Sequence, residues 1–397
     1  MTEQNQTINR LCWPIIYAIL IFVNVAYFPT IIGTSYYSVV TACVAGLTII
    51  YVLLNITDFF KWFGNTIILL TTFFLLFSLI VSMVFGVYDY FKQSSNFYLT
   101  ILCFSLGFLA PYPTQQKIRS AIAVFCITAC FMGLYSVFRN IGGFQITTLY
   151  GILLKNSSGV LLATATVLCI YISENGTTRT YKLSWIIIGI LCAACLLVFR
   201  SRSCIVSLML CGLVVGIKIF FQENNYEYKR KVCYLLILIL ALLVMNLLPI
   251  DFIYDSMLKN KSADNFNELS SGRGYMFELA LSIFEEHPLG GTLGTDIKLQ
   301  SVDNFLINQI GRYGWIGIIT NVPFYIYIWY ITVRGLIKTS IRRLYPFLTL
   351  LILCTVSLTE APFPFGPGTP CVCAYVLLGF YYNPCNSDIL DDSVLVN

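Results

Sequence analysis

The sequence predicts an all-α protein with many membrane-spanning helices, and three observations predict that fold class. Apolar residues make up 58% of the 397 residues. Only 11% are charged, whereas a soluble domain carries about 25% charged residues to cover its surface. The mean hydropathy is +0.79. These proportions exclude a soluble enzyme, a disordered chain and a nucleic-acid binder that relies on a basic patch.

The apolar residues form runs long enough to cross a bilayer, which requires about 20 residues per helix. The chain has twelve such candidate spans. Several are shorter than 20 residues, so either their ends lie several residues away or these helices lie in protein rather than in lipid. They are approximately Leu11–Phe28, Ile31–Leu54, Thr66–Gly86, Phe97–Ala110, Ser120–Phe138, Ser158–Ser173, Ser184–Phe199, Ser203–Phe221, Val232–Ile250, Trp315–Val333, Tyr345–Thr359 and Cys371–Tyr382. No small-residue cleavage site follows the first, so we expect a retained span and one integral membrane domain over residues 1–397.

Lysine and arginine residues predict which side of the membrane each loop occupies. With the N-terminus inside, the inner loops hold fourteen basic residues and the short outer loops hold five. The other five lie in one long loop, to which the rule does not apply. We therefore expect both termini on the cytoplasmic side.

The fifteen cysteines lie almost entirely within predicted spans. Cys192 and Cys195 form a C-x-x-C pair without histidine partners, so they are expected to be small buried apolar residues rather than a metal or redox site. Cys371 and Cys373 lie near the outer face, where a disulfide is an open alternative. No metal site and no cofactor are expected.

One outer loop, residues 251–314, separates the ninth and tenth spans, and loops of this length usually have a function. Within it, a polar stripe at helical spacing opposes an apolar one and predicts an amphipathic helix on the membrane surface, which Pro288 ends. The polar stripe is Glu278, Ser282, Glu285 and Glu286, and the apolar face is Tyr275, Met276, Leu279, Ile283 and Phe284.

A few outer arginines are candidates for binding an anion. Arg200 and Arg202 flank Ser201 between the seventh and eighth spans, Arg273 precedes the loop helix, and Arg312 precedes the tenth span. Arginine offers a planar fork of donors that suits phosphate oxygens. Each could instead be an interface anchor whose charged end reaches water, and that alternative stays open for Arg200 and for Arg139.

Two carboxylates are candidates for proton transfer or sugar binding. Asp303 stands where the long loop returns to the membrane, and Glu360 stands at the outer end of the eleventh span. A carboxylate at an apolar boundary can act as a base. Asp303 could equally cap the helix that follows it. His287, the only histidine, is expected to have a structural role at a helix end.

Several of these segments together resemble the O-antigen polymerase and ligase superfamily. They are S-G-R at 271–273, H-P-L-G-G at 287–291, D-N-F-L at 303–306, R-Y-G-W-I-G at 312–317, F-R-S-R-S at 199–203 and K-N-S-S-G at 155–159. Each motif is weak alone, but their order, sidedness and spacing are fairly specific. The resemblance covers residues 139–317, and the expected twelve-span topology extends it to both ends.

The resemblance implies a GT-C-like membrane glycosyltransferase in the bacterial inner membrane, without a metal. Its donor would be a glycan on undecaprenyl pyrophosphate, transferred at the periplasmic face to an acceptor hydroxyl. The superfamily's ligases carry a histidine before an asparagine where the loop rejoins the membrane. Here the pair is Asp303–Asn304, which favours a polymerase whose acceptor is another lipid-linked repeat unit.

The resemblance also implies roles for the outer residues. Arg202 and Arg273 would clamp the pyrophosphate with help from Arg312 or Arg200, and Asp303 would be the general base. Asn304 or Glu360 would position the sugar, with Asn156 in the substrate-binding set. Membrane lipid, a chain-length regulator and a flippase are the other expected partners. A ligase or capsule polymerase of the superfamily, and a flippase, are the alternatives.

Overall fold

The computed structural model describes residues 3–61, 66–85, 102–140, 155–176, 178–199, 201–221, 273–293, 295, 299, 302–361, 363–365 and 369–385. Every regular element within these ranges is a helix. Six helices are long and apolar enough to cross a membrane, and shorter apolar helices accompany them. The chain is therefore a polytopic, multi-pass membrane protein.

Most predicted spans correspond to helices. They are α1 (Glu3–Val25), α2 (Ser35–Leu54), α4 (Thr66–Phe85), α7 (Gln115–Asn140), α9 (Lys155–Glu174), α10 (Arg179–Val198) and α11 (Arg202–Phe221). The short helices α3 (Ile56–Lys61) and η1 (Ile341–Arg343) connect longer ones. The described part of the fourth predicted span, residues 102–110, contains only the five-residue helix α6 (Phe104–Phe108). The span predicted at 232–250 and the loop section 251–272 fall among the residues that the structure leaves undescribed.

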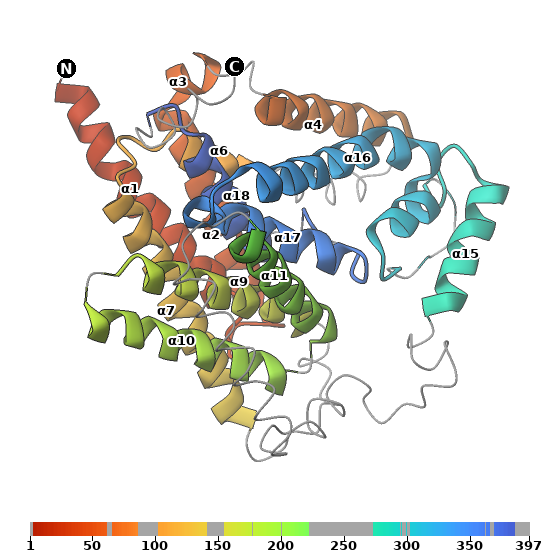
Figure 1. The fold of residues 1–397 in the computed structure, drawn as a ribbon. Coiled ribbons are helices and arrows are strands. Elements are labelled where there is room, and N and C mark those ends of the chain that lie inside the picture. The colour runs from red at the N-terminus through yellow and green to blue at the C-terminus, as the bar shows by residue number, and fades with distance from the viewer. Residues whose placement is uncertain are drawn as a thin grey trace, which may run out of the picture.

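Helix α9 is the centre of the bundle, with α7, α10 and α11 packed around it (Figure 1). It is the most buried of the six candidate spans. Ala163, Ala165 and Leu168 on α9 are inaccessible to solvent. A span enclosed by other helices needs less hydrophobicity than one that faces lipid, which explains why α9 is also the least hydropathic of the six.

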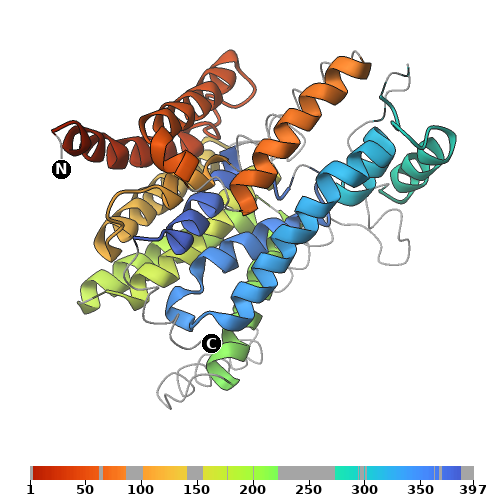
Figure 2. The same cartoon turned by 90° about the horizontal axis from the view of Figure 1, so that it is seen from above.

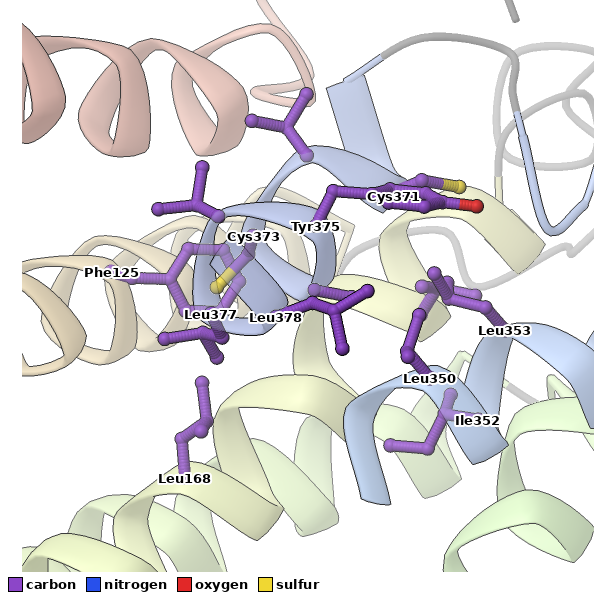
Figure 3. Packing of buried hydrophobic residues seen from close by; sticks show 14 of the residues in the cluster. Phe125, Leu168, Leu350, Ile352, Leu353, Cys371, Cys373, Tyr375, Leu377 and Leu378 are labelled. Carbon is purple, nitrogen blue, oxygen red and sulfur yellow. The ribbon is translucent and has the colours of Figure 1, made fainter. Parts of the chain in front are cut away.

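Helices α17 (Tyr345–Ser357) and α18 (Thr369–Tyr382) pack against each other and against α9. At about 1.5 Å per residue each is about 20 Å long, too short to cross the hydrocarbon core alone. Almost every residue of both helices is buried. Leu350 and Leu353 of α17 pack near Tyr375 of α18 in this core (Figure 3). The eleventh and twelfth predicted spans are therefore helices that lie in protein rather than in lipid.

Helix α16 (Phe305–Lys338) is a helical hairpin rather than one straight span. Its backbone leaves the helical conformation at Gly314, with φ 54° and ψ −141°. The Phe305 ring stacks on Tyr325 with 4.7 Å between centroids, although a straight helix would separate these residues by about 30 Å. A short limb at 305–313 thus folds back along a long limb at 315–338, so the start of the tenth span predicted at Trp315 is confirmed. Figure 2 shows α4 beside the long limb.

Candidate functional site

Polar side chains converge at one end of the bundle, where α9 and α11 begin and α17 ends. Consecutive antiparallel helices bring these termini to the same side. At the opposite end of α11, Lys218 donates hydrogen bonds to the carbonyl oxygens of Ile337 and Thr339. Residues 202 and 218 are about 24 Å apart along the helix, close to the thickness of the hydrocarbon core. The polar cluster therefore lies at one end of the apolar stretch of α11, and Lys218 lies at the other.

Three side chains in this cluster form a hydrogen-bond chain. The Ser201 hydroxyl donates to Oδ1 of Asn156 at 2.9 Å. The Asn156 amide nitrogen in turn donates to Oε1 of Glu360. Ser201 is inaccessible to solvent, while Asn156 and Glu360 are half-buried. The chain links the start of α9, the residue before α11 and the connection that follows α17.

Gly159 makes this close packing possible. A Cβ atom at position 159 would lie 2.8 Å from the Ser201 hydroxyl oxygen and 3.0 Å from the sulfur of Cys204. The Cys204 thiol donates to the backbone carbonyl of Asn156 at 3.5 Å. The K-N-S-S-G and F-R-S-R-S segments, 40 residues apart in sequence, therefore lie against each other.

The pair Asp303–Asn304 lies at the start of the short limb of α16. Asn304 is the N-cap residue: its side-chain oxygen accepts from the backbone N–H of Ile307 at 3.1 Å. Its amide nitrogen donates to the carbonyl of Leu358 at 3.0 Å, which joins the limb to the end of α17. The structure thus gives the capping role to Asn304 and not to Asp303. Both residues can cap, so the sequence alone could not decide between them.

The candidate arginines differ in their exposure and in how much of each residue the structure describes. Arg202 is the first residue of α11 and is half-buried beside Ser201. Arg273 is the first residue of α15 (Arg273–Glu286), but its side chain is not described, and Arg200 is one of the residues left out. Arg139, near the end of α7, is exposed, as an interface anchor would be.

Arg312 lies at the far end of the short limb. Its guanidinium donates to the carbonyl of Leu299 at 3.2 Å and so ties residue 299 of the long loop to the hairpin. Nine residues of mostly helical chain separate it from Asp303, about 13 Å along the axis. The structure therefore places Arg312 at the hairpin turn, away from the hydrogen-bonded cluster.

The turn at Gly314 is held by the segment that follows α15. The backbone N–H of Trp315 donates to the carbonyl of Pro288 at 2.8 Å, and that of Ile316 donates to Leu289 at 3.2 Å. The first N–H groups of a helix have no partner within it, and here the H-P-L-G-G segment supplies their acceptors. The two motifs thus form one backbone-bonded unit. His287 is exposed beside it, apart from the polar cluster.

The predicted amphipathic helix is present as α15 and ends at Glu286, as Pro288 predicts. Its buried face packs against α16 and includes Ala280 and Ile283, which contact Leu299 and Val302. Protein rather than the membrane surface therefore covers this face. Tyr275, which was expected on the apolar face, is 67% exposed and lies outside this packed cluster. Figure 1 shows α15 at the edge of the molecule beside α16.

The remaining sequence predictions concern cysteines and metals. Cys192, Cys195, Cys371 and Cys373 are buried free thiols, so the open alternative of a disulfide between Cys371 and Cys373 is not realised. Within the described ranges, no group of three or more His, Cys, Asp or Glu side chains is arranged to hold a metal ion.

Residues 187–322 match the sequence family described as O-antigen ligase. The match covers about a third of the chain, from α10 to the hairpin of α16. It includes Arg202, Arg273 and Asp303, whereas Asn156 and Glu360 lie outside it. The family covers polymerases and ligases of surface polysaccharide, in agreement with the resemblance seen in the motifs. The comparison with curated proteins found no match.

Proposed function

Because residues 187–322 form an O-antigen ligase family domain, we propose that this protein is a surface-polysaccharide (O-antigen) polymerase. It transfers a glycan from undecaprenyl pyrophosphate onto a second lipid-linked repeat unit. The reaction takes place at the periplasmic face of the bacterial inner membrane, and both termini are cytoplasmic. Residues 251–314 form the periplasmic loop between the ninth and tenth spans.

The observation that carries this proposal is the polar cluster at one end of the apolar helices, which we assign to the outer boundary of the membrane. It joins Ser201, Asn156 and Glu360 and lies beside Arg202. Asn304 connects the start of the α16 hairpin to the end of α17, at the same end of the bundle. A lipid-linked substrate presents its pyrophosphate and first sugars at this depth, while its polyprenyl tail lies between apolar helices.

The reaction needs charge stabilisation and a base. The bond between the anomeric carbon and the pyrophosphate oxygen breaks, and the acceptor hydroxyl oxygen forms the new glycosidic bond. Undecaprenyl pyrophosphate leaves with the negative charge, and fixed cations aimed at it lower the barrier. Arg202 and Arg273 provide these cations, with Arg200 or Arg312 assisting. No metal ion or cofactor takes part.

Asp303 is the general base that takes the proton of the acceptor hydroxyl. Asp303 directly precedes Asn304, the N-cap residue of the α16 hairpin. Asn304, Glu360 and Asn156 position the sugar. The pair Asp303–Asn304 stands where the ligases of the superfamily carry a histidine and an asparagine, which favours a lipid-linked repeat unit over lipid A core as the acceptor.

A ligase or capsule polymerase and a flippase are the two alternatives to this function. A ligase or capsule polymerase of the same superfamily would use the same donor with a different acceptor. A flippase for lipid-linked oligosaccharides would concentrate its polar groups at the midplane of the bilayer. The hydrogen-bonded cluster at the end of the bundle favours a transferase. A chain-length regulator and a separate flippase are the partners that a polymerase requires.

Deletion of the gene distinguishes these functions. Cells that lack a polymerase keep single repeat units on lipid A core and lose long chains. Silver-stained glycolipid gels of the deletion strain, with and without a plasmid copy, measure both species. Loss of the single units as well would contradict the polymerase and indicate a ligase or a flippase.

A further inference from the structure

The hydrogen-bond chain indicates a role for Ser201, a residue that carries no charge. Ser201 stands between two arginines and is inaccessible to solvent, so its hydroxyl does not itself contact a substrate. Its hydrogen bond is made to Oδ1 of Asn156 at 2.9 Å. A buried hydroxyl directed at a functional side chain fixes the orientation of that side chain.

The bond determines which way the Asn156 amide faces. With its oxygen held by Ser201, the amide must present its nitrogen to Oε1 of Glu360. Without the hydroxyl, the amide can rotate and direct its oxygen at the carboxylate, where two acceptors would repel each other. The position of the Glu360 carboxylate therefore depends on a serine two hydrogen bonds away.

Resting on the proposed function, we propose that Ser201 is a positioning residue for glycan transfer. It acts through Asn156 to hold Glu360 against a hydroxyl of the acceptor sugar. Gly159 is required for the same hydrogen-bond chain, because only a residue without a Cβ leaves room for Ser201 beside α9. Asn156 is then mainly the connection between Ser201 and Glu360 and less a direct ligand of the sugar.

A double-mutant cycle on the purified full-length protein in lipid nanodiscs tests this proposal. Ser201→Ala should raise the KM for a lipid-linked repeat unit about tenfold and leave kcat nearly unchanged, since one charge-supporting hydrogen bond is lost. In a Glu360→Ala background, which removes the acceptor of the Asn156 amide, Ser201→Ala should cause no further change, because the two residues act through one chain. Gly159→Ala should reproduce the effect without removing a polar group.

Ser207→Ala is the matched control. Ser207, which lies within α11, is likewise a buried serine. Its hydroxyl donates to the backbone carbonyl of Ser203 at 2.7 Å. Its loss should leave KM unchanged. The proposal is overturned if Ser201→Ala behaves like this control, or if the effects of Ser201→Ala and Glu360→Ala on KM add in full.

The acceptor that the wild-type protein uses tests the proposed function independently of the role of Ser201. Wild-type protein that transfers the glycan only to lipid A core would contradict the polymerase. The same cycle, measured on that transfer, would still support the role of Ser201 if the effect of Ser201→Ala disappeared in the Glu360→Ala background, and would overturn it if the two effects added.

Discussion

The backbone N–H of Trp315 donates to the carbonyl of Pro288 at 2.8 Å, and this bond connects the end of the loop helix to the first turn of a membrane span. The contact requires a glycine at position 314, because a Cβ atom there would lie 2.3 Å from the carbonyl oxygen of Pro288. The turn of the α16 hairpin and the segment after α15 therefore fold as one unit. That unit positions the short limb of α16, and Asp303 lies just before the start of this limb.

Replacing Gly314 should disrupt this unit. Gly314→Ala combines a positive φ of 54° with a collision against backbone, and such strain costs about 1–3 kcal/mol before the collision is added. We expect a lower midpoint of thermal unfolding for detergent-solubilised protein and a loss of long polymer in cells. Gly212→Ala on α11 is the control, since nothing lies within 4 Å of a Cβ there. Equal midpoints for the two variants would contradict the close docking.

Removing either proposed phosphate-binding arginine should abolish long polymer while the protein remains inserted. Arg202→Ala and Arg273→Ala each lose a cation directed at the leaving pyrophosphate, an effect typically of several kcal/mol in the transition state. Glycolipid gels measure chain length, and immunoblots of membrane fractions measure insertion. Arg139→Ala, at an exposed position on α7, should keep normal polymer. Normal chain ladders in the Arg202 and Arg273 variants would exclude the clamp.

Asp303 and His287 should differ sharply in their tolerance to substitution. Asp303→Asn keeps the size of the side chain but removes the base, and general base catalysis contributes about 10²–10⁴-fold in rate. His287→Ala removes an exposed side chain at the end of α15 and should leave the initial rate nearly unchanged. Initial rates of transfer to a lipid-linked acceptor compare the two. Similar rates for both variants would remove Asp303 as the base.

Lys218 should stabilise the bundle without contributing to transfer. It is 5% exposed and donates to the carbonyls of Ile337 and Thr339 at the end of α16, where a cation also complements the helix dipole. Lys218→Met should lower the free energy of unfolding by about 1.5–3 kcal/mol, the usual value of hydrogen bonds to a charged group. Lys338→Met, at an exposed position, is the control. An unchanged unfolding midpoint for Lys218→Met would show that these bonds add nothing.

Composition alone determined the fold class, because a chain with 11% charged residues cannot cover a surface exposed to water. Runs of apolar residues located most helices, and Trp315 marked the start of the long limb of α16 correctly. Local chemistry also set the end of α15, which stops at Glu286, two residues before Pro288. These features depend on neighbouring residues in the chain, which a sequence displays directly.

Tertiary structure decided which polar groups meet. Ser201, Asn156 and Glu360 come from three separate segments, and their contact depends on how α9, α11 and α17 pack, which no spacing in the sequence reveals. The choice of Asn304 over Asp303 as the cap and the burial of α15 against α16 depend likewise on long-range packing. The shortness of the last two spans left open whether they lie in protein or in lipid, because both environments require the same apolar side chains. The packing of α17 and α18 decided for protein.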